Sequence, residues 1–155
     1  MYPPIFPAIV AHAPALALLA GDPVRIFAFG EAPENTARPY VTWQIITGSP
    51  ENYLANRPDI DGYTLQVDVW ADDGQTARDV AAAVRDAIEP HAYIVRWGGE
   101  SRDPDTRAYR LSFDVSWFVL RPPYMLTPAY QQYATDYGVY RRQFDTTMNS
   151  RWADA

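Results

Sequence analysis

The segment YTLQVDVWA, residues 63–71, alternates between two sets of side chains and runs directly into a helical pattern. Tyr63, Leu65, Val67 and Val69 form the apolar set, and such a period of two is typical of a strand that is buried on one face. Residues 72–90 then carry an apolar stripe at helical spacing, with Asp72 or Asp73 near the N-cap and Pro90 after the end. This stretch therefore favours folds in which a sheet has helical cover on one face.

The other elements can be placed around this strand and helix. Residues 4–20 predict a first helix, with a kink or a late start at Pro14. Strands are predicted at 24–29, 40–48, 92–99 and 107–120, the last with clean alternation. Because most strands follow one another directly, we predict an α+β domain. Its mostly antiparallel sheet of about four to five strands packs with two helices, and a C-terminal aromatic-rich extension follows.

The domain is predicted to end near Leu120. Pro122 and Pro123 come next in the sequence and cannot continue a central strand. We therefore divide the chain into a domain at 1–120 and a C-terminal extension, or arm, at 121–155.

The extension carries aromatic residues at steps of three and four, which is the seam of an amphipathic helix: Tyr130, Tyr133, Tyr137, Tyr140 and Phe144. This stripe either packs on its own subunit or crosses to a neighbouring subunit, a connector or a tube. We favour the crossing arm because the domain already looks complete at Leu120.

Charge and composition exclude several functions. Residues 1–120 hold 16 acidic and 9 basic side chains, a balance of −7, whereas residues 121–155 balance to +1. An acidic body repels phosphates, which argues against a reader of DNA or RNA. The chain has no cysteine, so disulfides and thiol chemistry are absent, as suits a reducing cytosol.

No catalytic or metal site can be assembled from the sequence. Asp72 and Asp73 precede a helix and are interpreted as capping residues, and the fragment DIDG at 59–62 lacks the other ligands of a calcium loop. No nucleophile, base and orienting group can be nominated together. We expect neither an enzyme nor a cofactor.

Two tryptophans are candidates for subunit contacts. Trp70 lies on the polar face of its strand, where either the chain's own loop or tail, or a second subunit, is expected to cover it. Trp43 shares one face of the strand at 40–48 with Val41 and Ile45, and the opposite face is also partly apolar. This pattern predicts a strand that is covered on both sides.

Three segments together resemble a known family: DPVRIFAFGEAP, then RPYVTWQIITGSPENYLANRPDIDGYTLQVDVWADDGQTARDVAAAVRDAIEP, and RAYRLSFDVSWFV. Over about residues 10–119 the chain resembles the tail completion, or tail terminator, proteins of long-tailed bacteriophages. The RPY entry into a strand and the strand GYTLQVDVWA with its capped helix carry most of the likeness.

The resemblance implies a small structural subunit that assembles as a hexameric ring. Such a ring caps the tail tube protein, ends tail growth and presents a surface to the head–tail connector protein. Genomic DNA passes through its bore without specific binding. The resemblance also implies assembly in the host cytoplasm, a place in the tail–neck region of the virion, and no membrane. A head-closure or connector ring and a small-molecule-binding module are the alternatives.

The polar segment 49–62 is the remaining candidate contact. It contains Glu51, Arg57, Asp59 and Asp61 and is predicted to be a long loop, too polar for a core. Within a ring, we expect it to project toward the tube or the bore; the alternative is a solvated outer loop.

Overall fold

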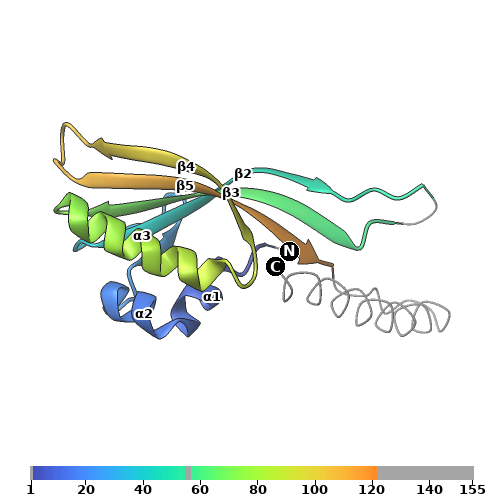
Figure 1. Ribbon diagram of the computed structural model, residues 1–155, viewed down its shortest axis with the longest axis horizontal. Coiled ribbons are helices and arrows are strands. Elements are labelled where there is room, and N and C mark those ends of the chain that lie inside the picture. Colours follow the sequence, from blue (N-terminus) through green and yellow to red (C-terminus); the bar gives the residue numbers. More distant parts are fainter. Residues whose placement is uncertain (1, 55–56, 122–155) are drawn as a thin grey trace, which may run out of the picture. The chain divides into compact units, whose positions relative to one another are not determined.

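The computed structural model describes residues 2–54 and 57–121, and the described residues up to Leu120 form one compact unit. Its sheet has five strands in the order β1-β2-β3-β5-β4 (Figure 1). The strands are β1 Ile26–Ala28, β2 Tyr40–Pro50, β3 Ile60–Ala71, β4 Tyr93–Arg102 and β5 Tyr109–Leu120. Only β1 and β2 pair in parallel, so the prediction of a mostly antiparallel α+β fold is confirmed.

One face of the sheet forms the core. The register places Val67 opposite Phe113, and both side chains are fully buried. Helix α3, Gly74–Ile88, packs on β3 and β5, and Val80 and Val84 of its apolar stripe are also fully buried. Helices α1 and α2 pack on α3. The alternation in β3 and β5 therefore separates a face buried under helices from an opposite face, the uncovered face, on which none of the described helices packs.

The predicted first helix is two helices, so the described residues form three helices and not two. These are α1, Ile5–Ala11, and α2, Ala13–Leu19, separated by His12 in an extended conformation. Pro14 lies in the first turn of α2. It has no N–H to donate to the carbonyl of Val10, so a continuous helix would lose a hydrogen bond there and meet the proline ring.

The strands also differ in length from the prediction. β2 and β3 continue into the polar segment 49–62, where Ser49 pairs with Gly62 and Pro50 with Asp61. The connecting loop therefore spans only residues 51–59, and the prediction of a loop over residues 49–62 was wrong. Pro50 is tolerated because this end of β2 has a partner strand on one side only, so its missing N–H breaks no ladder. β4 runs on to Arg102 as the edge partner of β5.

The N-cap of α3 is Asp73, one of the two residues, Asp72 and Asp73, that the sequence predicted for this role. The Thr76 N–H donates to Asp73 Oδ1 at 2.9 Å and the Thr76 hydroxyl donates to Oδ2 at 2.6 Å. These bonds, the hydroxyl one first, lower the pKa of the Asp73 carboxyl because they favour its charged form.

Replacing Asp73 with alanine is expected to lower the melting temperature by about 3 °C at pH 7, because two donors at the helix start lose their acceptor. A carboxyl whose pKa is lowered by folding stabilises the fold above its unfolded pKa, 3.8, and loses this effect as pH falls through the folded value. The difference in melting temperature between the unchanged protein and the Asp73→Ala variant should therefore disappear in acid. Asp79→Ala, on the exposed side of the same helix, serves as the control.

Candidate functional site

The face of the sheet without helical cover carries Trp70. The Trp70 indole N–H donates to Thr42 Oγ1 at 3.0 Å, and the ring stacks on Tyr40 at 6.1 Å between centroids. The Arg110 guanidinium lies 5.5 Å from the ring centroid of Trp70. Trp70 is thus half-buried by its own neighbours in the sheet, with part of its surface open. A subunit contact at Trp70 stays a prediction.

Two aspartates on the same face are held by arginines. Asp68 pairs with Arg110 at 2.8 Å, and Asp114 pairs with Arg96 at 2.7 Å. Both aspartates are only 8% exposed, although none of the described helices packs on this face. Each positive charge here faces a carboxylate, so these two arginines are poorly placed to attract phosphates.

Trp43 lies on the opposite face. It is half-buried, packs against the core and sits opposite Val67. Ile46, beside the irregularity in the β2 register, is exposed, so β2 is covered more completely on its core side. A contact role for Trp43 also stays a prediction.

The edge strand β4 exposes three large side chains. Tyr93, Val95 and Trp97 are 68%, 55% and 53% exposed, and among the described strands β4 pairs with β5 alone. At the other side of the sheet, β1 pairs with Val41–Trp43, so the rest of β2 is a second edge that no described strand covers. The sequence predicted the strand β4 but not the exposure of its side chains. The signal that could have indicated it was the apolar run Tyr93–Val95, which does not alternate with polar residues as the other strands do.

The residues predicted in the polar loop gather at one end of the sheet. Glu51 directly follows β2, Asp61 lies inside β3, and Arg57 and Asp59 lie in the connection between them. Leu54 in the same connection is fully exposed. Figure 1 shows this β2–β3 hairpin extending beyond helices α1, α2 and α3. The structure therefore brings these four predicted residues together, and their role in contacts stays a prediction.

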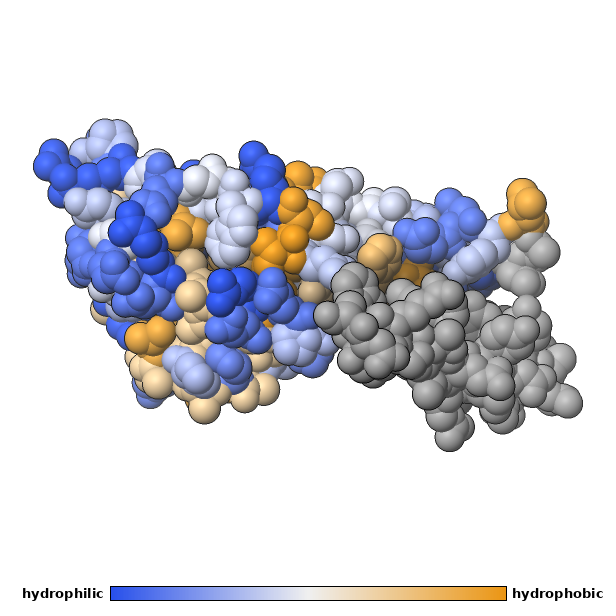
Figure 2. All heavy atoms as spheres, viewed as in Figure 1, coloured by the Kyte–Doolittle hydropathy of each residue, from blue (hydrophilic) through white to orange (hydrophobic). Residues whose placement is uncertain are grey.

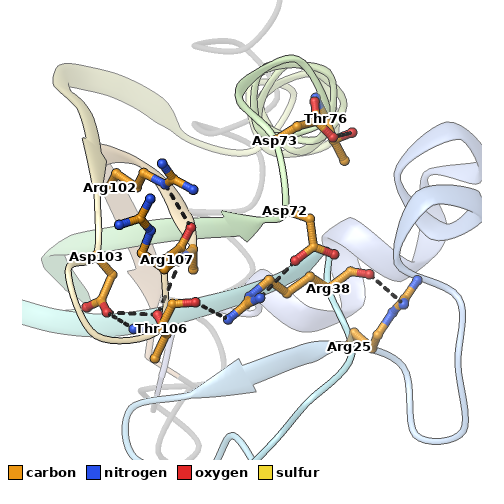
Figure 3. A network of polar contacts seen from close by, with 10 residues as sticks. Arg25, Arg38, Asp72, Asp73, Thr76, Arg102, Asp103, Thr106 and Arg107 are labelled. Atoms are coloured by element: carbon orange, nitrogen blue, oxygen red, sulfur yellow. Dashed lines mark hydrogen bonds and ion pairs between the residues drawn. The ribbon is translucent and has the colours of Figure 1, made fainter.

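Arg38 joins three connections at the opposite end of the sheet. It forms an ion pair with Asp72 at 2.8 Å and donates to the carbonyl of Thr106 at 3.4 Å, as Figure 3 shows. Arg25 donates to the Arg38 carbonyl at 3.4 Å. In the turn beside it, bonds from Thr106 lower the pKa of the Asp103 carboxyl. These contacts fix the loops in place and assemble no reactive group.

Three further expectations concern a metal site, a membrane span and the aromatic stripe of the extension. Within residues 2–54 and 57–121, no three potential ligand side chains gather as a metal site, and no helix has the length and hydropathy of a membrane span. The aromatic stripe from Tyr130 to Phe144 lies outside the described residues. Figure 2 shows hydrophobic side chains at the surface near the middle of the described unit, between hydrophilic regions.

Comparisons with known proteins identify the family of the chain. Residues 5–120 match the family described as tail completion protein gp17. The chain belongs to this family. It is therefore a structural protein of the tail of a phage-like virion, as the resemblance implied.

A solved structure supports the fold independently. A chain from the virion of a native gene transfer agent particle aligns with a TM-score of 0.57 and 15% identity, over 76% of this chain and 92% of the other. No curated protein matches the sequence.

Proposed function

We propose that this tail completion protein forms a hexameric ring that caps the tail tube, ends its growth and joins the tail to the head connector. The observation that carries the proposal is the pair of free strand edges on opposite sides of one sheet, β4 and the outer part of β2. Two different edges that pair between copies make a head-to-tail interface, and such an interface generates a closed ring when the rotation closes.

The exposed side chains of β4 support this contact. Tyr93, Val95 and Trp97 are large apolar groups exposed on a strand whose outer edge has no partner among the described strands, which is an aggregation risk for an isolated subunit. A neighbouring copy that covers this strand removes the risk and buries apolar surface. Trp43 pairs with Ala28 of β1, and Trp70 lies on the inner strand β3, so a contact at either tryptophan requires the neighbouring copy to reach over a face of the sheet.

The charge distribution suits a bore that carries DNA. The domain balances to −7, and Arg96 and Arg110 on the uncovered face are paired with aspartates. A ring of such subunits repels phosphates, so DNA passes without specific binding. The end of the β2–β3 hairpin, with Glu51, Arg57, Asp59 and Asp61, then faces the adjoining ring of the particle. Residues 121–155 serve as an arm beyond the domain at 1–120.

Particles assembled without this protein test the proposal. Electron microscopy is expected to show tails longer than those of complete particles, because nothing stops the addition of tube subunits. Adding the purified protein during assembly should restore a uniform length. Tails of normal length that lack heads would instead assign the protein to the connector.

A further inference from the structure

A shallow depression of about 180 Å³ lies on the uncovered face of the sheet, where β2, β3 and β5 run side by side. Its rim carries the Glu51 carboxylate and the Phe118 ring, which is 52% exposed. Across its floor, Thr47, Thr64 and Ser116 occupy matching positions on the three strands. The remaining lining residues are Gly48, Ser49, Gly62 and Tyr63.

Gly62 makes the depression possible. A Cβ atom at this position would lie 3.2 Å from Glu51 Oε1 and 3.3 Å from a carbon of the Phe118 ring. Both distances are tighter than ordinary contacts, so any larger residue would push the carboxylate and the ring away from the strand. The glycine thus lets a negative charge and an aromatic ring approach the same point on the sheet.

This combination of groups suits a guanidinium. A carboxylate accepts two parallel N–H bonds from arginine, and an aromatic ring attracts a planar cation. The hydroxyls of Thr64 and Ser116 add acceptors for the remaining donors. An ammonium group has three donors on one nitrogen and no flat face, so it fits this set less well.

The segment that borders the depression is acidic. Residues 49–62 contain three carboxylates, on Glu51, Asp59 and Asp61, against one arginine, and the Glu51 carboxylate lines the depression itself. In the described part of the chain, Glu51 has no ion-pair partner. An acidic end with an unpaired carboxylate beside an aromatic ring is complementary to a basic partner.

We propose that the depression receives an arginine side chain from the protein that adjoins this end of the ring. The arginine stacks on Phe118 and donates to Glu51, which fixes the register between the two rings. The inference rests on the proposed function, since it requires a neighbouring protein in the particle.

The full-length chain labelled with 4-fluorophenylalanine tests the site without any ring or tail. The Phe118 fluorine signal, assigned with Phe118→Leu, is followed during titration with N-acetyl-arginine amide. We expect a saturable shift with a dissociation constant in the millimolar range, and weaker binding of N-acetyl-lysine amide. N-acetyl-citrulline amide, which has the same shape without the charge, should give no saturation. Equal shifts with all three compounds would overturn the proposal.

Two variants sharpen the test. Glu51→Gln should weaken the arginine compound about tenfold, because a charge-assisted pair becomes a neutral contact. Glu34→Gln removes an equal charge from the loop between β1 and β2 and should leave binding unchanged. Unchanged melting temperatures confirm that both variants are folded. Equal losses in the two variants would reduce the effect to net charge and overturn the site. Because tail length does not enter this measurement, the site and the terminator function can fail separately.

Discussion

Replacing Val95 and Trp97 together with lysine is expected to give a folded subunit that no longer forms rings. Both side chains are more than half exposed on the edge strand, so the subunit loses little of its own packing. Within the subunit, the variant loses the contact between Trp97 and Phe113, whose ring centroids are 5.3 Å apart. A pair of charges on a strand edge opposes pairing with another strand, because each charge would have to be desolvated at the interface.

Sedimentation and electron microscopy measure the result. The variant should sediment as a monomer under conditions in which the unchanged protein assembles, and particles made with it should carry overlong tails. The matched control is Phe6→Lys with Leu18→Lys, which adds two charges at exposed apolar residues of helices α1 and α2, outside the sheet. Rings that form normally from the Val95 and Trp97 variant would show that β4 lies outside the subunit contact.

A chain that ends at Arg121 is expected to fold with a melting temperature within about 3 °C of the full-length value. The described core is built from residues between Ile5 and Val119, and its central side chains Leu65, Val67 and Phe113 are fully buried by that unit's own strands and helices. The truncated protein should still cap tubes but fail to give stable head–tail joints, because the proposed arm is missing.

Calorimetry and counts of joined particles measure the two effects separately. A full-length control with serine at Tyr130, Tyr133, Tyr137, Tyr140 and Phe144 keeps the length of the arm and removes only the aromatic groups. The same loss of joints in this control would assign the effect to the stripe. A truncated chain that is insoluble or unfolded would show instead that the stripe completes the core of its own subunit.

The sequence by itself determined which side chains face the core. Alternation in β3 and β5 places Val67 and Phe113 on the face that packs against the helices and Asp68 on the opposite face, because successive side chains of a strand point to opposite faces. The N-cap of α3 was also readable to within one residue, Asp72 or Asp73, since a capping bond is made within one helical turn, and the bond from Thr76 assigns it to Asp73. The family resemblance extended these local patterns to the role of the chain in the virion tail.

Only the tertiary structure decided which strands are neighbours. β5 inserts between β3 and β4, so Tyr93, Val95 and Trp97 lie on a free edge. A period of two specifies the face of each side chain and leaves the neighbouring strand open, because pairing depends on contacts far apart in the sequence. The same limit applies to the depression, where Glu51 directly follows β2, Gly62 lies in β3 and Phe118 lies in β5. Local periodicity cannot bring them together; the register of the sheet does.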